Sequence, residues 1–174
     1  MSDPHIELWA EDEVYFQRHS SITRMWSLRG HQPQIISAST REKVGFLGAL
    51  NVKTGQLITK RASVFNAESF GDFLQYFLQC TEGKVFLILD NTTWHRARDL
   101  KGFFSDNQDR LVRVFLPPYS PELNPIERVW RITRRTVTHN RYFASVKELE
   151  TDLVSYFAKW KQANRTLRVL CANI

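Results

Sequence analysis

Apolar residues in this sequence fall into short segments with two different spacings. From Ile6 to Gln17 they alternate with polar residues, which is typical of a strand with one face in a core. Apolar runs cover Val85–Leu89 and, with the single interruption of Arg113, Leu111–Leu116; such runs between turn signals predict strands buried on both faces. Two more strands are predicted over Lys43–Asn51 and Leu57–Val64, joined by a short turn that contains a glycine. The first three strands therefore predict an antiparallel meander.

Helical spacing marks the segments between and after the later strands. Apolar residues recur at i, i+3, i+4, i+7 and i+8 over Phe70–Leu78, behind Asn66 as a candidate N-cap, so one face of this helix should pack on a sheet. A second helix is predicted over His95–Asn107, a third from Pro125, and a fourth after the capping box Ser145–Glu148. The order of elements predicts a mixed sheet flanked by helices.

The size and composition of the chain fit one folded domain, and we expect residues 1–174 to form it. Hydrophobic residues make up 43% and charged residues 24%, which excludes disorder as the default. No apolar run approaches the roughly 18 residues of a membrane span, and the first residues lack a signal-peptide pattern, so we expect a cytoplasmic protein. Cys80 and Cys171 are far apart without CxxC spacing, which predicts neither a zinc site nor a disulfide framework.

Positive charge is concentrated near the C-terminal end of the sequence. The net charge is +6, but residues 1–127 carry 14 Lys/Arg against 15 Asp/Glu, a net of −1. Residues 128–174 carry 10 Lys/Arg against 3 Asp/Glu, a net of +7. A basic surface next to acidic groups suits an enzyme that holds a polyanion over a metal site. A solvated basic face is the structural alternative.

Three carboxylates stand where such a sheet could bring them together. Asp12 interrupts the apolar face of the first strand, Asp90 ends the fourth strand, and Glu127 begins the third helix. If the first and fourth strands are neighbours, Asp12 and Asp90 lie about 5 Å apart. Carboxylates this close repel each other unless a cation binds, and Mg²⁺ and Mn²⁺ prefer oxygen ligands. Two such ions can promote an in-line displacement at phosphorus.

Each acid also has an ordinary structural interpretation. Asp12 could pair with an arginine in the core, and Asp90 could belong to a turn at the end of its strand. Asn124 could cap the third helix, with Glu127 as the acid of a capping box. Glu122 competes with Glu127 as a third ligand, although a loop holds an acid less firmly than a helix does. From the residues alone, a metal-dependent nuclease is one interpretation among these.

Three segments together resemble the DDE transposases of the insertion-sequence 630 / Tc1-mariner superfamily. They are Ala10–Glu13, Leu89–His95 and Pro117–Trp130, and the last one reads PPYSPELNPIERVW. This long motif is specific, and the 36 residues between Asp90 and Glu127 agree with the spacing in the family. The resemblance extends over nearly the whole chain.

The resemblance implies an α/β, RNase H-like fold, with a mixed five-stranded sheet in the order 3-2-1-4-5, an antiparallel second strand and flanking helices. It implies that Asp12, Asp90 and Glu127 are catalytic and bind two Mg²⁺ or Mn²⁺ ions per active site. The reaction would be hydrolysis of phosphodiester bonds at transposon ends, followed by transfer of the 3′-hydroxyl into target DNA. The alternatives are a general RNase H-like nuclease and a retired transposase that serves as a DNA-binding module.

The resemblance also implies partners. Double-stranded DNA would be the substrate, and a homodimer would form in the synaptic complex, at the nucleoid in the cytoplasm. Family members carry an N-terminal helix-turn-helix region that recognises transposon ends, and no such region fits before Asp12, so we expect end recognition in a separate part.

Individual residues near the three acids also have predicted roles. Trp130 is predicted to be a core residue, and His95 could touch the DNA backbone or position Asp90. The predicted DNA-binding residues are His95, Arg96, Arg131, Arg134 and Arg135.

Overall fold

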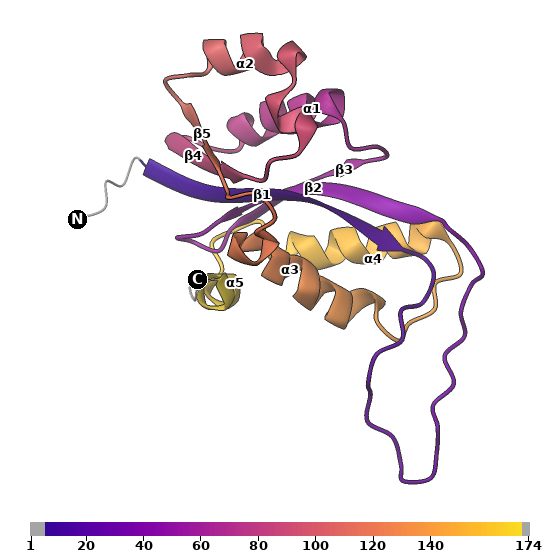
Figure 1. Ribbon diagram of the computed structural model, residues 1–174. Coiled ribbons are helices and arrows are strands. Elements are labelled where there is room, and N and C mark those ends of the chain that lie inside the picture. Colours follow the sequence, from indigo (N-terminus) through magenta and orange to yellow (C-terminus); the bar gives the residue numbers. More distant parts are fainter. Residues whose placement is uncertain (1–5, 172–174) are drawn as a thin grey trace.

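Five strands form one mixed sheet in the computed structural model, which describes residues 6–171 (Figure 1). The sheet order is β3-β2-β1-β4-β5; β2 is antiparallel to β1 and β3, whereas β4 is parallel to β1 and β5. The implied sheet order and antiparallel second strand are therefore confirmed. The ends of the expected 1–174 domain, residues 1–5 and 172–174, lie outside the described residues. The strands are β1 (Ile6–Gln17), β2 (Lys43–Asn51), β3 (Leu57–Ala62), β4 (Lys84–Leu89) and β5 (Leu111–Phe115).

Helices cover both faces of this sheet (Figure 1). One face carries α1 (Ala67–Gln79) and α2 (Lys101–Asp106), and the other carries α3 (Ile126–Thr133), α4 (Val146–Ala158) and α5 (Arg165–Cys171). Each face has its own hydrophobic core, because successive residues of a strand point to opposite sides. The strand predicted over Ile6–Gln17 is confirmed, but both of its faces are covered: Trp9 packs in the α1 core, whereas Ala10, Val14 and Phe16 pack in the α3 and α4 core.

The first helix forms as its sequence predicts. The side chain of Asn66 accepts a hydrogen bond from Ser69 N at 2.9 Å, and the Ser69 hydroxyl accepts one from Asn66 N at 3.0 Å. These bonds satisfy backbone donors that the helix itself leaves free. The predicted apolar stripe is buried, and consists of Phe70, Phe73, Leu74, Phe77 and Leu78.

The predicted helix over His95–Asn107 is wrong. This segment contains two 3₁₀ turns, η1 (Thr93–Arg96) and η2 (Arg98–Leu100), followed by the short helix α2. Ala97 separates the turns because its backbone is extended, with φ −59° and ψ 143°. The break fixes the direction of His95 separately from the direction of α2.

The capping box that was the structural alternative for Asn124 and Glu127 does not form. No side chain caps the N-terminus of α3. Instead, Asn124 Nδ2 donates a hydrogen bond to the backbone oxygen of Glu11 at 2.9 Å. Asn124 therefore ties the start of α3 to β1, which holds the helix of Glu127 against the strand of Asp12. After Thr133 the helix continues as one π-helical turn, η4 (Arg134–Thr138).

A long connection between β1 and β2 extends away from the sheet (Figure 1). It is anchored at its base by an ion pair between Arg18 Nε and Glu42 at 2.8 Å. The hydroxyl of Ser20 also donates to the backbone oxygens of Ile36 and Arg141. Among the described helices, none is both long and apolar enough to cross a membrane.

Candidate active site

The candidate active site lies where β4 ends and β1 continues beyond it. The two strands pair in parallel up to Ala10 and Ile88, so Asp12 and Asp90 each lie two residues past the last pair. Side chains two residues apart on a strand share a face, and both aspartates line one pocket of about 410 Å³ together with Glu127 of α3. The fold thus brings together the three acids that the sequence singled out.

The proline-rich motif forms much of the wall of this pocket. Residues 116–121 line it, and Tyr119 in this stretch has a positive φ of 56°. Asn91 Nδ2 donates to the backbone oxygen of Leu116 at 2.6 Å and so ties the end of β4 to the end of β5. Glu122, the competing third acid, is exposed and does not line the pocket. The position on α3 therefore favours Glu127.

Asp12 is held in an environment that disfavours its charge. Burial, together with the negative charges of Glu127 and Glu13, raises the pKa of Asp12 to about 8. Its Oδ2 accepts a hydrogen bond from Trp130 Nε1 at 3.0 Å, which works in the opposite direction. Crowded carboxylate oxygens of this kind fit a hard divalent cation, which would relieve their repulsion.

Trp130 is a core residue, as predicted, but it is also the donor to Asp12. Its ring occupies space that is open because residue 48 is a glycine. Gly48 lies opposite Asp12 in the pairing of β1 with β2, and a Cβ atom there would lie 2.5 Å from Trp130 Cη2. A glycine at this position is therefore what lets the indole reach Asp12.

Asp90 has the opposite electrostatic environment. Burial alone would raise its pKa, but hydrogen bonds from His95 and Thr92 outweigh burial and lower the pKa of Asp90 to about 2. His95 Nδ1 lies 3.0 Å from Asp90 Oδ1, and the same oxygen accepts a bond from Thr92 N at 2.9 Å. Asp90 is therefore ionised at neutral pH and ready to bind a cation.

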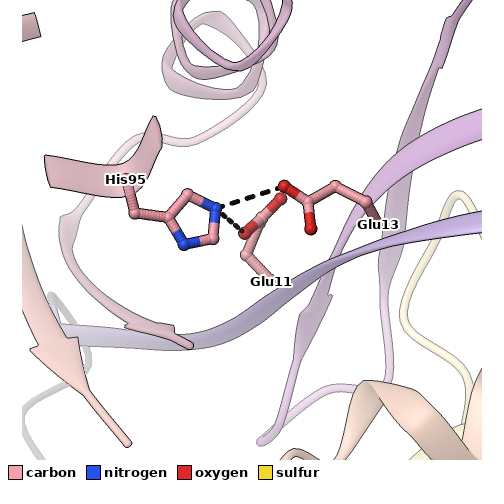
Figure 2. A group of neighbouring side chains, drawn as sticks. All are labelled: Glu11, Glu13 and His95. Carbon is pink, nitrogen blue, oxygen red and sulfur yellow. Dashed lines mark ion pairs between the residues drawn. The ribbon is translucent and has the colours of Figure 1, made fainter. Parts of the chain in front are cut away.

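Sequence analysis missed a second acidic group on the opposite face of β1. Figure 2 shows Glu11 and Glu13 pointing from β1 toward the imidazole of His95. His95 Nε2 lies 3.4 Å from Glu11 Oε2 and 3.3 Å from Glu13 Oε1. A signal was present, because Glu11 and Glu13 follow Trp9 at alternate positions of β1, and a tryptophan on a strand is commonly buried.

Burial and charge act strongly on this acidic group. Burial raises the pKa of Glu11 well above its usual value, and the charge of Glu13 raises it further. Burial would lower the pKa of His95, but hydrogen bonds to Asp90 and Glu13 and the charge of Glu11 raise it to about 10. The surrounding carboxylates therefore favour the protonated, imidazolium form of His95.

The predicted DNA-binding residues lie in different environments. His95 is fully buried beneath Asp90, so it has no surface with which to contact DNA. Arg96 is exposed and hydrogen-bonds to the pocket residue Asn91. Arg131 and Arg135 are exposed, whereas Arg134 is half-buried, with its guanidinium over the ring of Phe16.

The chain is similar in sequence to an insertion-element protein. It is 30% identical over 142 residues to the insertion element IS630 uncharacterized 39 kDa protein of Shigella sonnei, which covers 80% of this chain and 41% of that protein. The chain thus spans less than half of the length of this relative.

Its fold is similar to that of the Mos1 transposase. The Mos1 paired-end complex with left transposon end gives a TM-score of 0.70 at 14% identity, and covers 95% of this chain and 51% of that one. The Mos1 mariner paired end complex with Mn gives 0.66 at 14% identity, with the same coverage. The shared fold is RNase H-like.

The family follows from the sequence match together with this geometry. The model of the DDE superfamily endonucleases matches residues 7–150, a range that contains all three pocket acids and the buried acidic group behind them. The chain belongs to the DDE superfamily of endonucleases, with an insertion-element protein among its relatives.

Proposed function

We propose that this chain is the catalytic domain of a DNA transposase, in which Asp12, Asp90 and Glu127 hold two Mg²⁺ or Mn²⁺ ions. It hydrolyses phosphodiester bonds at transposon ends and joins the freed 3′-hydroxyl to target DNA. The observation that carries this proposal is the single pocket lined by these three acids, which come from three separate elements. The choice of metal is supported by the similar fold of the Mos1 mariner paired end complex with Mn.

The residues of the chain prepare the pocket for this reaction. Bound divalent ions would activate the attacking oxygen and stabilise the leaving oxygen in an in-line displacement. Asp90 supplies a carboxylate that is already ionised, whereas Asp12 gives up its proton when a cation replaces it. The hydrogen bond from Trp130 fixes the direction of one Asp12 oxygen, and the proline-rich wall limits how a phosphate can approach.

Double-stranded DNA is the proposed substrate, since transposon DNA is present in the Mos1 paired-end complex. Arg96, Arg131, Arg134 and Arg135 are proposed to contact its phosphates, with the exposed Arg131 and Arg135 in the leading role. The protein would act as a homodimer in a synaptic complex at the nucleoid. Recognition of the transposon ends is proposed to belong to a separate N-terminal part.

Anomalous diffraction from a crystal soaked in Mn²⁺ tests the metal centre. We expect manganese bridging Asp12 and Asp90, with Glu127 in reach, and no manganese in crystals of Asp12→Asn. Glu122→Gln is the matched control, because Glu122 is exposed and outside the pocket. Absence of manganese from the wild-type pocket would contradict a catalytic function and favour the retired DNA-binding module.

The products of a nuclease assay separate the two enzymatic interpretations. The transposase proposal predicts DNA molecules in which a 3′ end has been joined to target DNA. Cleavage of an RNA–DNA hybrid without any joined product would instead identify a general RNase H-like nuclease. The Asp90→Asn variant should abolish either activity and so excludes a contaminating enzyme.

A further inference from the structure

His95 connects the pocket to the acidic group behind it. Its two ring nitrogens face opposite ways: Nδ1 lies 3.0 Å from Asp90 Oδ1, and Nε2 lies within 3.4 Å of Glu11 and Glu13. A side chain with donors on both sides of a ring can hold two carboxylates at a fixed separation. Among the described residues of η1, His95 alone contacts both an acid of β1, Glu11, and the acid that follows β4, Asp90.

The ring of His95 is locked in this orientation. It is 0% exposed and packs on the ring of Phe70, with ring centroids 4.3 Å apart. Glu13, one of its acidic partners, is fixed in turn by Trp94, whose Nε1 donates to Glu13 Oε1 at 2.6 Å. Turning the ring would break contacts on both sides in a place that water does not reach.

The buried Glu11 explains why one ring nitrogen of His95 faces away from the pocket while the other faces Asp90. Glu11 is 1% exposed, and within the described residues neither of its carboxylate oxygens accepts a hydrogen bond. A buried carboxylate without such partners is costly unless a cation faces it. The imidazole of His95 fills that position. Its Nε2 faces the two glutamates as an ion pair, whereas Nδ1 lies 3.0 Å from Asp90 Oδ1 and 2.9 Å from Thr92 Oγ1.

Asp90 is left with one oxygen for the pocket. Its Oδ1 is taken up by His95 Nδ1 and by Thr92 N, which leaves Oδ2 for a ligand. Asp12 lies on β1 between Glu11 and Glu13. One short stretch of β1 therefore carries Asp12 itself and, through the contacts of Glu11 and Glu13 with His95, also helps to place Asp90.

We propose that His95 is a positioning residue, which holds Asp90 in the direction of the metal pocket and is itself held by the buried pair Glu11 and Glu13. This inference rests on the proposed function, because it takes a metal ion to be the ligand of Asp90. It adds residues on the far face of β1, outside the pocket, to the set that determines metal affinity.

Two histidine variants separate positioning from simple core packing. The amide nitrogen of asparagine lies where Nδ1 lies in histidine, and that of glutamine lies nearer to Nε2. His95→Asn can therefore keep a donor toward Asp90, whereas His95→Gln loses it. We expect His95→Gln to weaken Mn²⁺ binding about 10- to 100-fold, as loss of an outer-shell partner does in other metal sites. His95→Asn should weaken it less, because it keeps the donor toward Asp90 and loses only the contact with Glu11 and Glu13.

Glu11→Gln tests the contact on the Nε2 side of His95 and changes no residue that lines the pocket. It should weaken Mn²⁺ binding in the same direction as His95→Gln. Glu7→Gln is the matched control: Glu7 lies on the same strand and accepts bonds from Trp9 Nε1 and Gly83 N, away from His95. Isothermal titration with Mn²⁺ alone, beside thermal unfolding in chelator, measures affinity apart from stability. Lower stability with unchanged affinity in His95→Gln and Glu11→Gln would overturn the proposal.

The wild-type crystal soaked in Mn²⁺ keeps the inference testable if a variant does not fold. We expect Asp90 Oδ2 on the metal while Oδ1 stays in contact with His95 Nδ1. Manganese bound between Glu11, Glu13 and His95 would overturn the positioning role, because a metal would then replace the imidazolium proton. Metal in the main pocket with unaffected variants refutes this inference alone, whereas a wild-type pocket that binds no metal refutes the proposed function with it.

Discussion

At the scale of single residues, Asp12 and Asp90 differ in what each receives from its neighbours. Asp12 receives one neutral donor, Trp130, and faces the negative charge of Glu127. Asp90 receives a donor from His95 and another from the backbone of Thr92. The same residue type therefore holds its proton at one position and loses it at the other, in a single pocket.

The protonation of Asp12 should be visible in the stability of the protein in chelator. Its pKa is raised from 3.8 to about 8, so across this range the folded protein keeps a proton that the unfolded chain has released. The free energy of unfolding therefore falls as pH rises from about 4 to 8. Asp12→Asn has no such proton, so its stability relative to wild type should increase with pH, by at most about 1.4 kcal/mol per pH unit.

Urea unfolding of both proteins at a series of pH values measures this difference. The two largest causes that raise the pKa of Glu11, its burial and the charge of Glu13, are present in both proteins, so most of that shift cancels in the comparison. Glu122→Gln, which replaces an exposed carboxylate outside the pocket, is the control variant. A difference between Asp12→Asn and wild type that does not change with pH would show that Asp12 is ionised in the folded protein without metal.

Trp130→Phe removes the donor to Asp12 and leaves an aromatic ring in the core. We expect Mn²⁺ affinity to fall about 10- to 100-fold, the usual effect of losing a partner that orients a metal ligand. Trp160→Phe is the matched control, since Trp160 is a buried tryptophan that packs on Tyr156. Isothermal titration with Mn²⁺ measures the effect, and equal affinities for the two variants would argue that the indole N–H does not orient Asp12.

At the scale of elements, the contact between β2 and α3 depends on Gly48, which has no side chain and so leaves space for the ring of Trp130. Gly48→Ala would place a methyl group 2.5 Å from the ring of Trp130, which lies within a filled core. Overpacking of this kind costs about 1–3 kcal/mol, so Gly48→Ala should lower stability and weaken Mn²⁺ binding through the displaced indole.

Gly102→Ala is the opposite case. A Cβ atom at Gly102 of α2 meets nothing within 4 Å, and alanine is favoured over glycine in helices by about 0.5–1 kcal/mol. We therefore expect Gly102→Ala to be neutral or stabilising, with unchanged Mn²⁺ affinity. Thermal unfolding of the pair of variants gives the comparison, and similar losses in both would contradict the role given to the space at Gly48.

Local patterns predicted those elements whose stability is local. The alternation in β1 and the stripe and cap of α1 can be read from spacing, because each depends on residues close together in the chain. The turn at Ala97 could not be read in this way, since apolar spacing does not report an extended backbone at one residue. For the same reason, the predicted helix over His95–Asn107 failed.

The active site shows the same division. Asp12, Asp90 and Glu127 were singled out because each stands at a strand or helix position with a recognisable pattern. The family resemblance then supplied their grouping and the order of the sheet. The contact of Asn124 with Glu11 joins residues 113 positions apart, and His95 meets Glu11 and Glu13 from a different element. Such contacts arise from tertiary packing, which single-sequence patterns do not contain.

At the scale of the whole molecule, the basic excess of residues 128–174 starts on the helix that carries Glu127. Arg131→Ala should lower DNA affinity, and the slope of log affinity against log salt should decrease by about one if Arg131 contacts a phosphate. Arg61→Ala removes the same charge from β3, where Arg61 pairs with Glu150 at 2.8 Å, and so controls for net charge. Fluorescence anisotropy with double-stranded DNA over a range of salt concentrations measures both slopes. Equal slopes for the two variants would remove Arg131 from the proposed interface.

The alternation of Glu11, Asp12 and Glu13 on β1 has a consequence for anyone who aligns related sequences. Three adjacent acids invite an alignment to slide by one position at almost no penalty in score. In the folded chain that slip would exchange an acid that lines the pocket for one that is buried against His95. The preceding apolar residues remove the ambiguity: the acid two positions after Ala10 faces the pocket, and the one two positions after Trp9 does not. Alignments of this family should therefore be anchored on that apolar pair.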